Sequence, residues 1–272
     1  MANQEVIYEK KGRIAFVTIN RPERMNAVAL STNAEMYDIW TDFLEDPEVW
    51  IGIISGAGGK AFCAGSDIKE MTTRPAGERV SKDSDSPHQE GGMAHREIWK
   101  PLIAAVNGYC LGGGLEIAMA CDIIIASDTS SFGVPEIRNV GGFPGDGGIH
   151  RLPRHVPRKI AMEMLLTGTR ISAERALRIG LINKIVPPDQ VMDEAIAMAN
   201  TINENSPVAA RVSKEIATKT MDLPLEYYES EADKAWDLDR IVGAKLRNSE
   251  DSKSREGPRS FVEKRKPVWL GR

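Results

Sequence analysis

The sequence predicts an α/β fold with a helical region appended at the C-terminal end. Over the first two-thirds of the 272 residues, apolar runs of strand length alternate with helical patterns. From Arg158 onward the pattern is almost entirely helical, and no flexible linker or repeat interrupts it. We therefore expect a core formed by residues 1–200 and a C-terminal helical region formed by residues 201–272.

The elements of the core can be assigned in order along the chain. A β-branched and aromatic run at 13–20 predicts a strand that ends before a proline turn. An amphipathic pattern at 31–44 predicts a helix with Ser31 as its N-cap. Further strands are predicted at 49–55, 101–107, 121–127 and 183–186, and a helix is predicted to start within GGGLEIAMAC.

The remaining segments are helical or irregular. Residues 72–95 are polar and broken by Pro and Gly, which predicts a mobile surface excursion of the kind that often covers a binding site. Helices are predicted at 158–168 and 172–180, each closed by a glycine, and at 190–205, 207–220 and 224–242.

Composition excludes several classes of protein. The formal net charge is -4 and the basic residues are scattered, which argues against nucleic-acid binding. No secretory signal and no apolar run of membrane-spanning length is visible, so we expect a cytoplasmic protein that does not bind membranes. The cysteines and histidines lack the spacing of disulfide or metal sites, so reduced core thiols and no metal are expected: Cys63, Cys110, Cys121, His88, His95, His150 and His155.

Two glycine-rich segments carry the first signal of chemistry. Neither completes a nucleotide-binding motif such as GxGxxG or GxxxxGK[ST]. The glycines at 112–114 precede a helix, however, and so leave unpaired N–H groups at its positive end, which suits an oxyanion. A second set of candidate donors lies in FCAGSDI at 62–68, directly after a predicted strand.

Two acids carry the second signal. Glu116 lies in the first turn of the helix after the glycines, and Glu136 follows Pro135. Taken alone, Glu116 fits a residue that matches the helix dipole, and Glu136 fits an ordinary loop carboxylate. Both acids follow strands that could lie side by side, and paired carboxylates in one pocket give one base and one acid. Glu116, near a helix N-terminus, is the better candidate for the base.

Longer motifs resemble a known family. The segments INRPERMNA, KAFCAGSDIKEM, AVNGYCLGGGLEIAMACDIIIAS, FGVPEIRNVGGFPGDGGIHRLPR and EGPRSFVEKRKPVW are similar to those of the crotonase superfamily, the enoyl-CoA hydratase and isomerase group. The resemblance covers nearly the whole chain. It implies a crotonase-like (ClpP/crotonase) fold, in which a ββα spiral core carries the acyl-CoA site and a C-terminal helical region forms trimers.

The resemblance also implies roles for individual residues. Ser66 and Gly113 match the two backbone N–H donors of the family's oxyanion hole, and Glu116 and Glu136 match the pair that holds and activates water. It further implies a homotrimer or a dimer of trimers, and coenzyme A as part of the substrate with no separate cofactor. Residues matching the coenzyme A loop are Ala64, Asp67, Ile68 and Lys69, and those matching contacts to a neighbouring subunit's coenzyme A are Phe261 and Lys264.

Two departures from the family pattern leave the substrate open. Ser66 stands where many hydratases have alanine, and Asp146 stands where many members have a small residue, so Asp146 is a possible substrate contact. Enoyl-CoA hydration is the reaction expected from two acids. The alternatives are a carnitinyl-CoA dehydratase, which the tail and HRLPRHVP resemble, and an isomerase, which usually keeps one acid. A C–C hydrolase, which would need a histidine at Ile137, and a non-catalytic RNA-binding or scaffold member are weaker alternatives.

Overall fold

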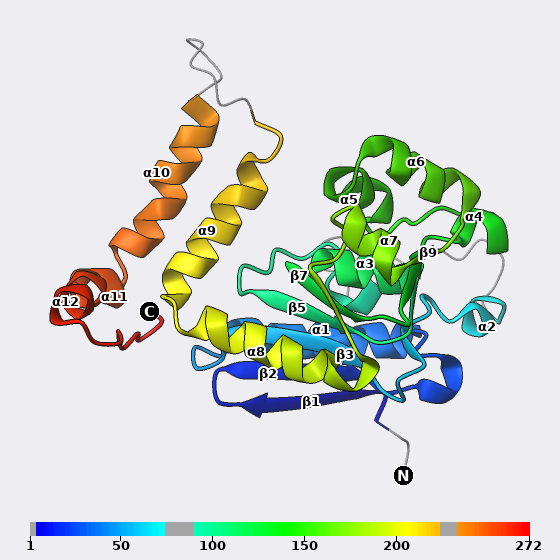
Figure 1. Ribbon diagram of the computed structural model, residues 1–272, viewed down its shortest axis with the longest axis horizontal. Coiled ribbons are helices and arrows are strands. Elements are labelled where there is room, and N and C mark those ends of the chain that lie inside the picture. The colour runs from blue at the N-terminus through cyan, green and yellow to red at the C-terminus, as the bar shows by residue number, and fades with distance from the viewer. Residues whose placement is uncertain (1–3, 74–89, 224–232) are drawn as a thin grey trace.

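The computed structural model describes residues 4–73, 90–223 and 233–272 (Figure 1). Its main sheet has six strands in the order β1-β2-β3-β5-β7-β10. Neighbouring strands from β2 to β10 are parallel, and β1 is antiparallel to β2. The five strands predicted from sequence are confirmed, whereas β1 was not predicted because charged residues fill its second half. The strands are β1 (Val6–Lys11), β2 (Ile14–Ile19), β3 (Ile51–Gly56), β5 (Leu102–Val106), β7 (Ile123–Ser127) and β10 (Lys184–Val186).

A second sheet of very short strands stands beside the first. Its order is β4-β6-β8-β9, and the pairs β4–β6 and β6–β8 are parallel. These strands have three residues or fewer, too few for hydrophobic periodicity to reveal them. They are β4 (Ala61–Cys63), β6 (Tyr109–Leu111), β8 (Ser131–Gly133) and β9 (Ile171–Ser172).

The chain winds through both sheets in a repeated order. A strand of the main sheet, a strand of the small sheet and a helix follow one another as β3-β4-α2, β5-β6-α3 and β7-β8-α4. This is the ββα spiral that the resemblance implies. The helices of the core are α1 (Leu30–Glu45), α2 (Ile68–Met71), α3 (Gly113–Ala120), α4 (Glu136–Asn139), α5 (Gly148–His155), α6 (Arg158–Thr167), α7 (Ala173–Arg178) and α8 (Val191–Asn203).

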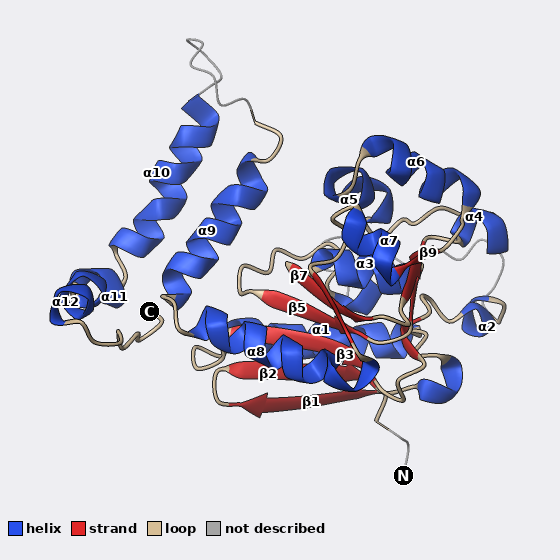
Figure 2. Cartoon of the chain, viewed as in Figure 1, coloured by secondary structure: helices blue, strands red, loops and turns tan. Residues whose placement is uncertain are grey.

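Helices cover both faces of the main sheet (Figure 2). Successive strand residues point to opposite faces, so Ile54 packs with Trp40 and Phe43 of α1 while Ile53 packs on the side of α8. The predicted N-cap of α1 is wrong. The helix begins at Leu30, and the Thr32 hydroxyl accepts the Ala29 N–H at 3.2 Å.

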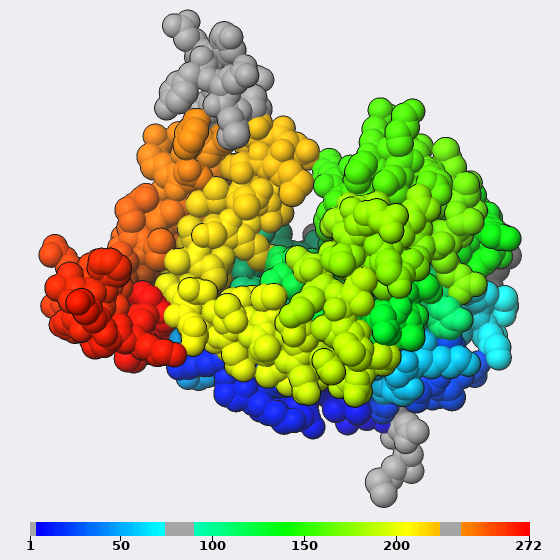
Figure 3. All heavy atoms as spheres, in the orientation of Figure 1, coloured from blue at the N-terminus to red at the C-terminus, as the bar shows by residue number. Residues whose placement is uncertain are grey.

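The C-terminal helices form a projection away from the sheets (Figures 1 and 3). Helices α9 and α10 pack on each other through a small apolar cluster that includes Val208, Val212 and Val242. The predicted helix at 207–220 is confirmed, and the helix predicted at 224–242 overlaps α10, with 224–232 outside the described residues. The helices are α9 (Pro207–Thr220), α10 (Asp233–Arg247), α11 (Glu250–Lys253) and α12 (Glu256–Glu263). The boundary between the two predicted regions, at residue 200, stays a prediction.

The surface excursion predicted at 72–95 is wrong for its last part. Residues 90–94 are buried, beginning with the short 3₁₀ helix η2 (Glu90–Gly92). Gly91 N–H donates to Asn33 Oδ1 at 2.8 Å, and a Cβ added at Gly92 would lie 2.3 Å from the Tyr37 nitrogen. The glycines that suggested a loop thus allow the backbone to pack closely against α1. Residues 74–89 lie outside the described residues.

Candidate active site

The predicted site residues follow three neighbouring parallel strands of the small sheet. Ser66 comes after β4, Gly113 and Glu116 come after β6, and Glu136 comes after β8. The carboxyl ends of parallel strands meet at one edge of a sheet, and polar groups that follow them converge there. The strand arrangement therefore confirms that the segments carrying the two glutamates are neighbours.

Glycines allow the first two segments to touch. A Cβ added at Gly114 would lie 2.1 Å from the Cys63 carbonyl oxygen, and one added at Gly65, which has a φ of +94°, would lie 3.1 Å from the Gly113 nitrogen. Within the described parts of the chain, neither Ser66 N–H nor Gly113 N–H donates to a backbone carbonyl. Two free donors thus lie close together at the positive N-terminal end of α3, as an oxyanion hole requires.

Glu116 is buried, with 2% of its surface exposed, yet its charge is compensated. The Gly148 N–H, at the start of α5, donates to Glu116 Oε1 at 2.7 Å. Arg151, one turn further along α5, supplies an opposite charge: burial lowers the pKa of Arg151, and the negative charges of Glu116 and Asp146 oppose that change. No cationic residue near Glu116 in the sequence had indicated this partner.

Glu136 has different surroundings. Its Oε1 lies 3.1 Å from the position that a Cβ would take at Gly112, which puts the carboxyl group at the N-terminal end of α3. Burial raises the pKa of Glu136, and the nearby charge of Asp146 adds to the effect. Its Oε2 is buried without a hydrogen-bond partner in the described part of the chain. One carboxylate is therefore held by a peptide N–H while the other favours its protonated form, as an acid–base pair requires.

Asp146 lies in the wall of this site. It is 3% exposed, its Oδ1 accepts Glu90 N–H at 3.4 Å, and its carbonyl oxygen accepts Arg151 Nη1–H at 3.1 Å. Its negative charge adds to the rise in the pKa of Glu136. Glu90 and Arg151 were missed because neither residue carries a motif signal and because 72–95 was interpreted as a surface loop.

The loop expected to hold coenzyme A has a mixed arrangement. Ala64 is half-buried, and Ile68 and Lys69 are exposed on α2. The Asp67 side chain points inward: Oδ1 accepts the Lys69 N–H at 3.1 Å, and Oδ2 pairs with Arg21 Nη2 at 3.0 Å. Burial alone would raise the pKa of Asp67, but the Glu70 N–H and Arg21 lower it overall. The Asp67 carboxylate is therefore used to cap α2.

The structure does not bring Phe261 and Lys264 to this site. Phe261 lies on α12 and is 86% exposed, and Lys264 follows that helix. Helix α12 and helix α2 lie on opposite sides of the molecule (Figure 1). If these two residues contact coenzyme A, the contact must be with another subunit's site.

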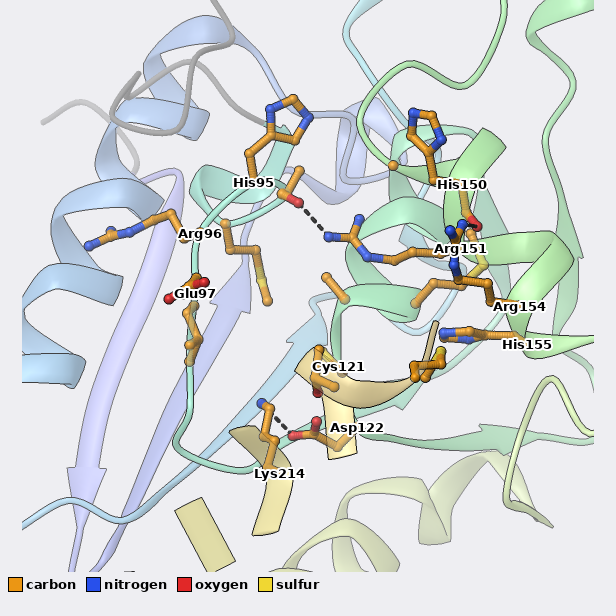
Figure 4. Close-up of a pocket in the computed structure, with 18 of the residues that line it drawn as sticks. His95, Arg96, Glu97, Cys121, Asp122, His150, Arg151, Arg154, His155 and Lys214 are labelled. Carbon is orange, nitrogen blue, oxygen red and sulfur yellow. Dashed lines mark hydrogen bonds and ion pairs between the residues drawn. The ribbon is translucent and has the colours of Figure 1, made fainter. Parts of the chain in front are cut away.

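A separate cavity of about 750 Å³ lies between α5, α9 and residues 93–99 (Figure 4). Arg151 lines it and donates to the Ala94 carbonyl at 2.5 Å, while Lys214 pairs with Asp122 at 2.7 Å. This cavity is distinct from the predicted site. Among the described residues, its lining includes none of Ser66, Gly113, Glu116 and Glu136.

Comparison with known proteins agrees with this geometry. The family model for enoyl-CoA hydratase/isomerase matches residues 9–272. The chain belongs to the enoyl-CoA hydratase/isomerase family.

This chain is similar to named relatives over nearly its whole length. It is 39% identical over 266 residues to an (E)-benzylidenesuccinyl-CoA hydratase from Thauera aromatica, covering 98% of this chain and 99% of the relative. It is 40% identical over 271 residues to the carnitinyl-CoA dehydratase of Escherichia coli K12, covering 97% of each. A solved enoyl-CoA hydratase from Mycobacterium marinum superposes with a TM-score of 0.87 at 38% identity, covering 98% of this chain and 99% of that one. The crotonase fold implied by the sequence motifs is thus confirmed.

Of the other predictions made from the sequence, only some are tested by the structure. Cys63, Cys110 and Cys121 are free and buried, as predicted. No helix in residues 4–73, 90–223 and 233–272 is long and apolar enough to cross a membrane. The cytoplasmic location, the oligomeric state and the roles of the individual site residues stay predictions.

Proposed function

We propose that this chain is a hydro-lyase that adds water across the 2,3 double bond of a 2-enoyl-CoA, and in reverse dehydrates a 3-hydroxyacyl-CoA. The observation that carries the proposal is the convergence of two free N–H donors and two unlike carboxyl groups at the start of α3. The names of the relatives, a hydratase and a dehydratase of CoA thioesters, support the same class of reaction. We propose a cytoplasmic role in fatty-acid or related acyl-CoA metabolism, with coenzyme A entering as part of the substrate and no separate cofactor.

The thioester carbonyl is the group that the oxyanion hole recognises. Its oxygen accepts hydrogen bonds from the N–H groups of Ser66 and Gly113. When water adds at C3, negative charge moves onto this oxygen to form an enolate, and the two donors with the α3 dipole stabilise it. These interactions strengthen as charge develops, so they lower the barrier rather than only bind the substrate.

The two glutamates exchange the protons. Glu116, which is held by Gly148 N–H and lies near Arg151, acts as the base and takes a proton from water as its oxygen attacks C3. Glu136, whose pKa burial raises, acts as the acid and gives its proton to C2. The proton then returns from Glu116 to Glu136, so the cycle adds one water and leaves both groups as they began.

Turnover of crotonyl-CoA tests the proposal through loss of the absorbance of the conjugated thioester. Glu116→Gln and Glu136→Gln should each reduce kcat by about 10²–10⁴-fold, the usual contribution of a general acid or base. Glu163→Gln, an exposed change on α6, serves as the matched control and should leave kcat unchanged. Wild-type rates in both site variants would contradict the assignment of the two glutamates.

A second candidate substrate has a polar acyl chain. Asp146 puts a further buried carboxylate beside Glu136, and a carboxylate can attract a quaternary ammonium group such as that of a carnitinyl chain. A screen of short, long, aromatic and carnitinyl acyl-CoAs distinguishes the candidates. If the polar chain is the substrate, Asp146→Asn lowers kcat/KM for the crotonobetainyl thioester more than for crotonyl-CoA. Equal losses would remove this candidate.

A further inference from the structure

The carboxylate of Glu90 stands against both residues of the oxyanion hole. The Ser66 hydroxyl donates to the Glu90 carboxylate, with both Oε atoms at 3.1 Å. On the other side, Glu90 Oε1 lies only 1.9 Å from the position that a Cβ would take at Gly113. The side chain therefore touches Gly113 over a face that only glycine leaves open. Glu90 is 2% exposed and is not one of the groups used in the proposed reaction.

This position conflicts with the charge that the reaction creates. An enolate oxygen bonded to Ser66 N–H and Gly113 N–H would develop negative charge next to the carboxylate. Two like charges that lie close together repel each other, and the Glu90 carboxylate is itself buried. A thioester can therefore enter the oxyanion hole and react only when the Glu90 carboxylate has moved aside.

The backbone around Glu90 is fixed by hydrogen bonds, whereas the bond between Glu90 and Ser66 can be exchanged. Glu90 N–H donates to Asp146 Oδ1, and the next residue, Gly91, donates to Asn33 and accepts from Trp40 Nε1–H at 2.9 Å. The bond from Ser66, in contrast, joins two side chains and can be replaced by rotation about single bonds. An alanine at position 66 would keep the backbone N–H of the oxyanion hole and lose this bond.

We propose that Ser66 and Glu90 form an autoinhibitory contact, in which the Glu90 carboxylate lies beside the oxyanion hole until the carbonyl of an acyl-CoA thioester displaces it. The inference rests on the proposed function, since it takes Ser66 N–H and Gly113 N–H as the thioester donors. It assigns the serine a task that its backbone N–H alone does not explain. It also predicts that removing either side-chain group tightens the binding of thioesters.

Calorimetric titration with butyryl-CoA, a saturated thioester that cannot be hydrated, tests this directly. Glu90→Gln keeps the size of the side chain and removes its charge, and it should lower the Kd by about tenfold, or about 1.4 kcal/mol. Ser66→Ala should lower the Kd by a smaller factor. The double variant should bind no more tightly than Glu90→Gln, because the two changes disrupt one interaction.

Two controls separate the contact from general effects. Free coenzyme A lacks the thioester carbonyl, so its Kd should not change in any variant. Glu97→Gln removes an exposed carboxylate seven residues along the same segment and should leave the Kd for butyryl-CoA unchanged. Ser66→Ala is the smaller change and still tests the contact if Glu90→Gln folds poorly.

The outcomes distinguish this inference from the proposed function. Unchanged or weaker binding of butyryl-CoA by both Glu90→Gln and Ser66→Ala overturns the autoinhibitory contact, even if crotonyl-CoA is hydrated. Tighter binding by the variants without any hydration supports the contact and contradicts the proposed reaction. A wild-type protein that binds neither butyryl-CoA nor coenzyme A contradicts both.

Discussion

At the scale of single residues, the two glutamates of the site bury their carboxyl groups in different ways. Glu116 accepts a peptide N–H and lies near a guanidinium, so its charge is stabilised within the protein. Glu136 has a buried oxygen without a partner in the described residues. A buried polar group left unsatisfied is destabilising, and such a defect in a native protein usually serves a function.

Glu136→Gln should therefore stabilise the protein while reducing its activity. Burial raises the pKa of Glu136, so the folded state binds this proton more tightly than the unfolded chain does. Wild-type stability is then lost as the pH rises from the ordinary glutamate value, about 4.3, through the raised folded value. At pH 7 the variant should have the higher Tm, and the difference should vanish near pH 4.

The control for this prediction is Glu163, whose pKa is shifted in the opposite direction. Arg175 lowers the pKa of Glu163, with Nη2 to Oε2 at 2.7 Å on an exposed face. Its contribution to stability is present above the ordinary glutamate pKa and is lost as the pH falls. Glu163→Gln should thus lower the Tm slightly at pH 7, and melting curves across pH compare both variants. A lower Tm for Glu136→Gln at pH 7 would contradict the role of burial.

Arg151 provides a second prediction at this scale. Its guanidinium donates to the carbonyl groups of Asp146 and Ala94 and faces the buried charge of Glu116. Arg151→Met keeps much of the volume but removes the donor to both carbonyl groups and the positive charge opposite Glu116, and should lower the free energy of unfolding by about 3–5 kcal/mol. Arg154→Met, on the same helix, removes an exposed pair with Asp222 and should cost less than about 1 kcal/mol. Denaturant unfolding measures both, and equal losses would contradict a structural role for Arg151.

At the scale of elements, sequence patterns revealed the strands that were long and apolar. The strands β2, β3, β5 and β7 are apolar runs of five or six residues and were found within three residues of their ends. Strands such as β4 and β8, with three residues each, leave no period to detect. Helix α5 was also missed, because it contains Pro153 and follows a glycine-rich turn.

The contrast between long elements and short ones also explains how much of the site could be predicted. Family motifs located Ser66, Gly113, Glu116 and Glu136, and the short strands supply the geometry that joins them. No local pattern in the sequence indicates that Glu90 returns to the oxyanion hole, since its contact with Ser66 spans 24 positions. Nor does sequence show that the Asp67 carboxylate is turned inward toward Arg21. Such contacts depend on tertiary packing.

Packing of α3 against β4 gives a prediction for an element. Gly114 is in the first turn of α3, where alanine would normally favour a helix. A Cβ there would meet the Cys63 carbonyl oxygen at 2.1 Å, so Gly114→Ala must push α3 away from β4. We expect a loss of at least about 1–3 kcal/mol in the free energy of unfolding, together with reduced turnover as the oxyanion hole opens.

Gly142→Ala is the matched control for that change. The nearest atom to a Cβ at Gly142 is Val140 Cγ2, at 3.6 Å, which is an ordinary contact. Its effect on stability should stay within about 0.5 kcal/mol. Denaturant unfolding of both variants provides the measurement. A Gly114→Ala protein as stable as the wild type would show that α3 and β4 are not closely packed.

At the scale of the whole molecule, the C-terminal helices expose several large apolar side chains. Trp236 and Ile241 lie exposed on α10, and Phe261 and Val262 lie exposed on α12. Apolar side chains gathered on a projection usually mark a protein interface. The predicted trimer or hexamer would bury such a surface.

A charge on α10 tests that expectation. Ile241 is 63% exposed, so Ile241→Lys should fold normally as a single chain but disfavour burial of this face in an assembly. Light scattering after gel filtration should give the wild type a mass of three or six chains and the variant a lower mass. A wild type that elutes as a single chain would contradict the predicted assembly.

Assembly would also explain why Phe261 and Lys264 lie far from their own chain's site. If they contact a neighbour's coenzyme A, each site combines the glutamates of one chain with the tail of another. Co-expressing Glu116→Gln chains with Phe261→Ala/Lys264→Ala chains under two tags would then create mixed oligomers in which some sites have both parts intact. At a subsaturating concentration of crotonyl-CoA, the doubly purified protein should exceed the mean rate of the two separate variants. A rate no higher than that mean would contradict a shared site, because each defect would then affect only its own chain.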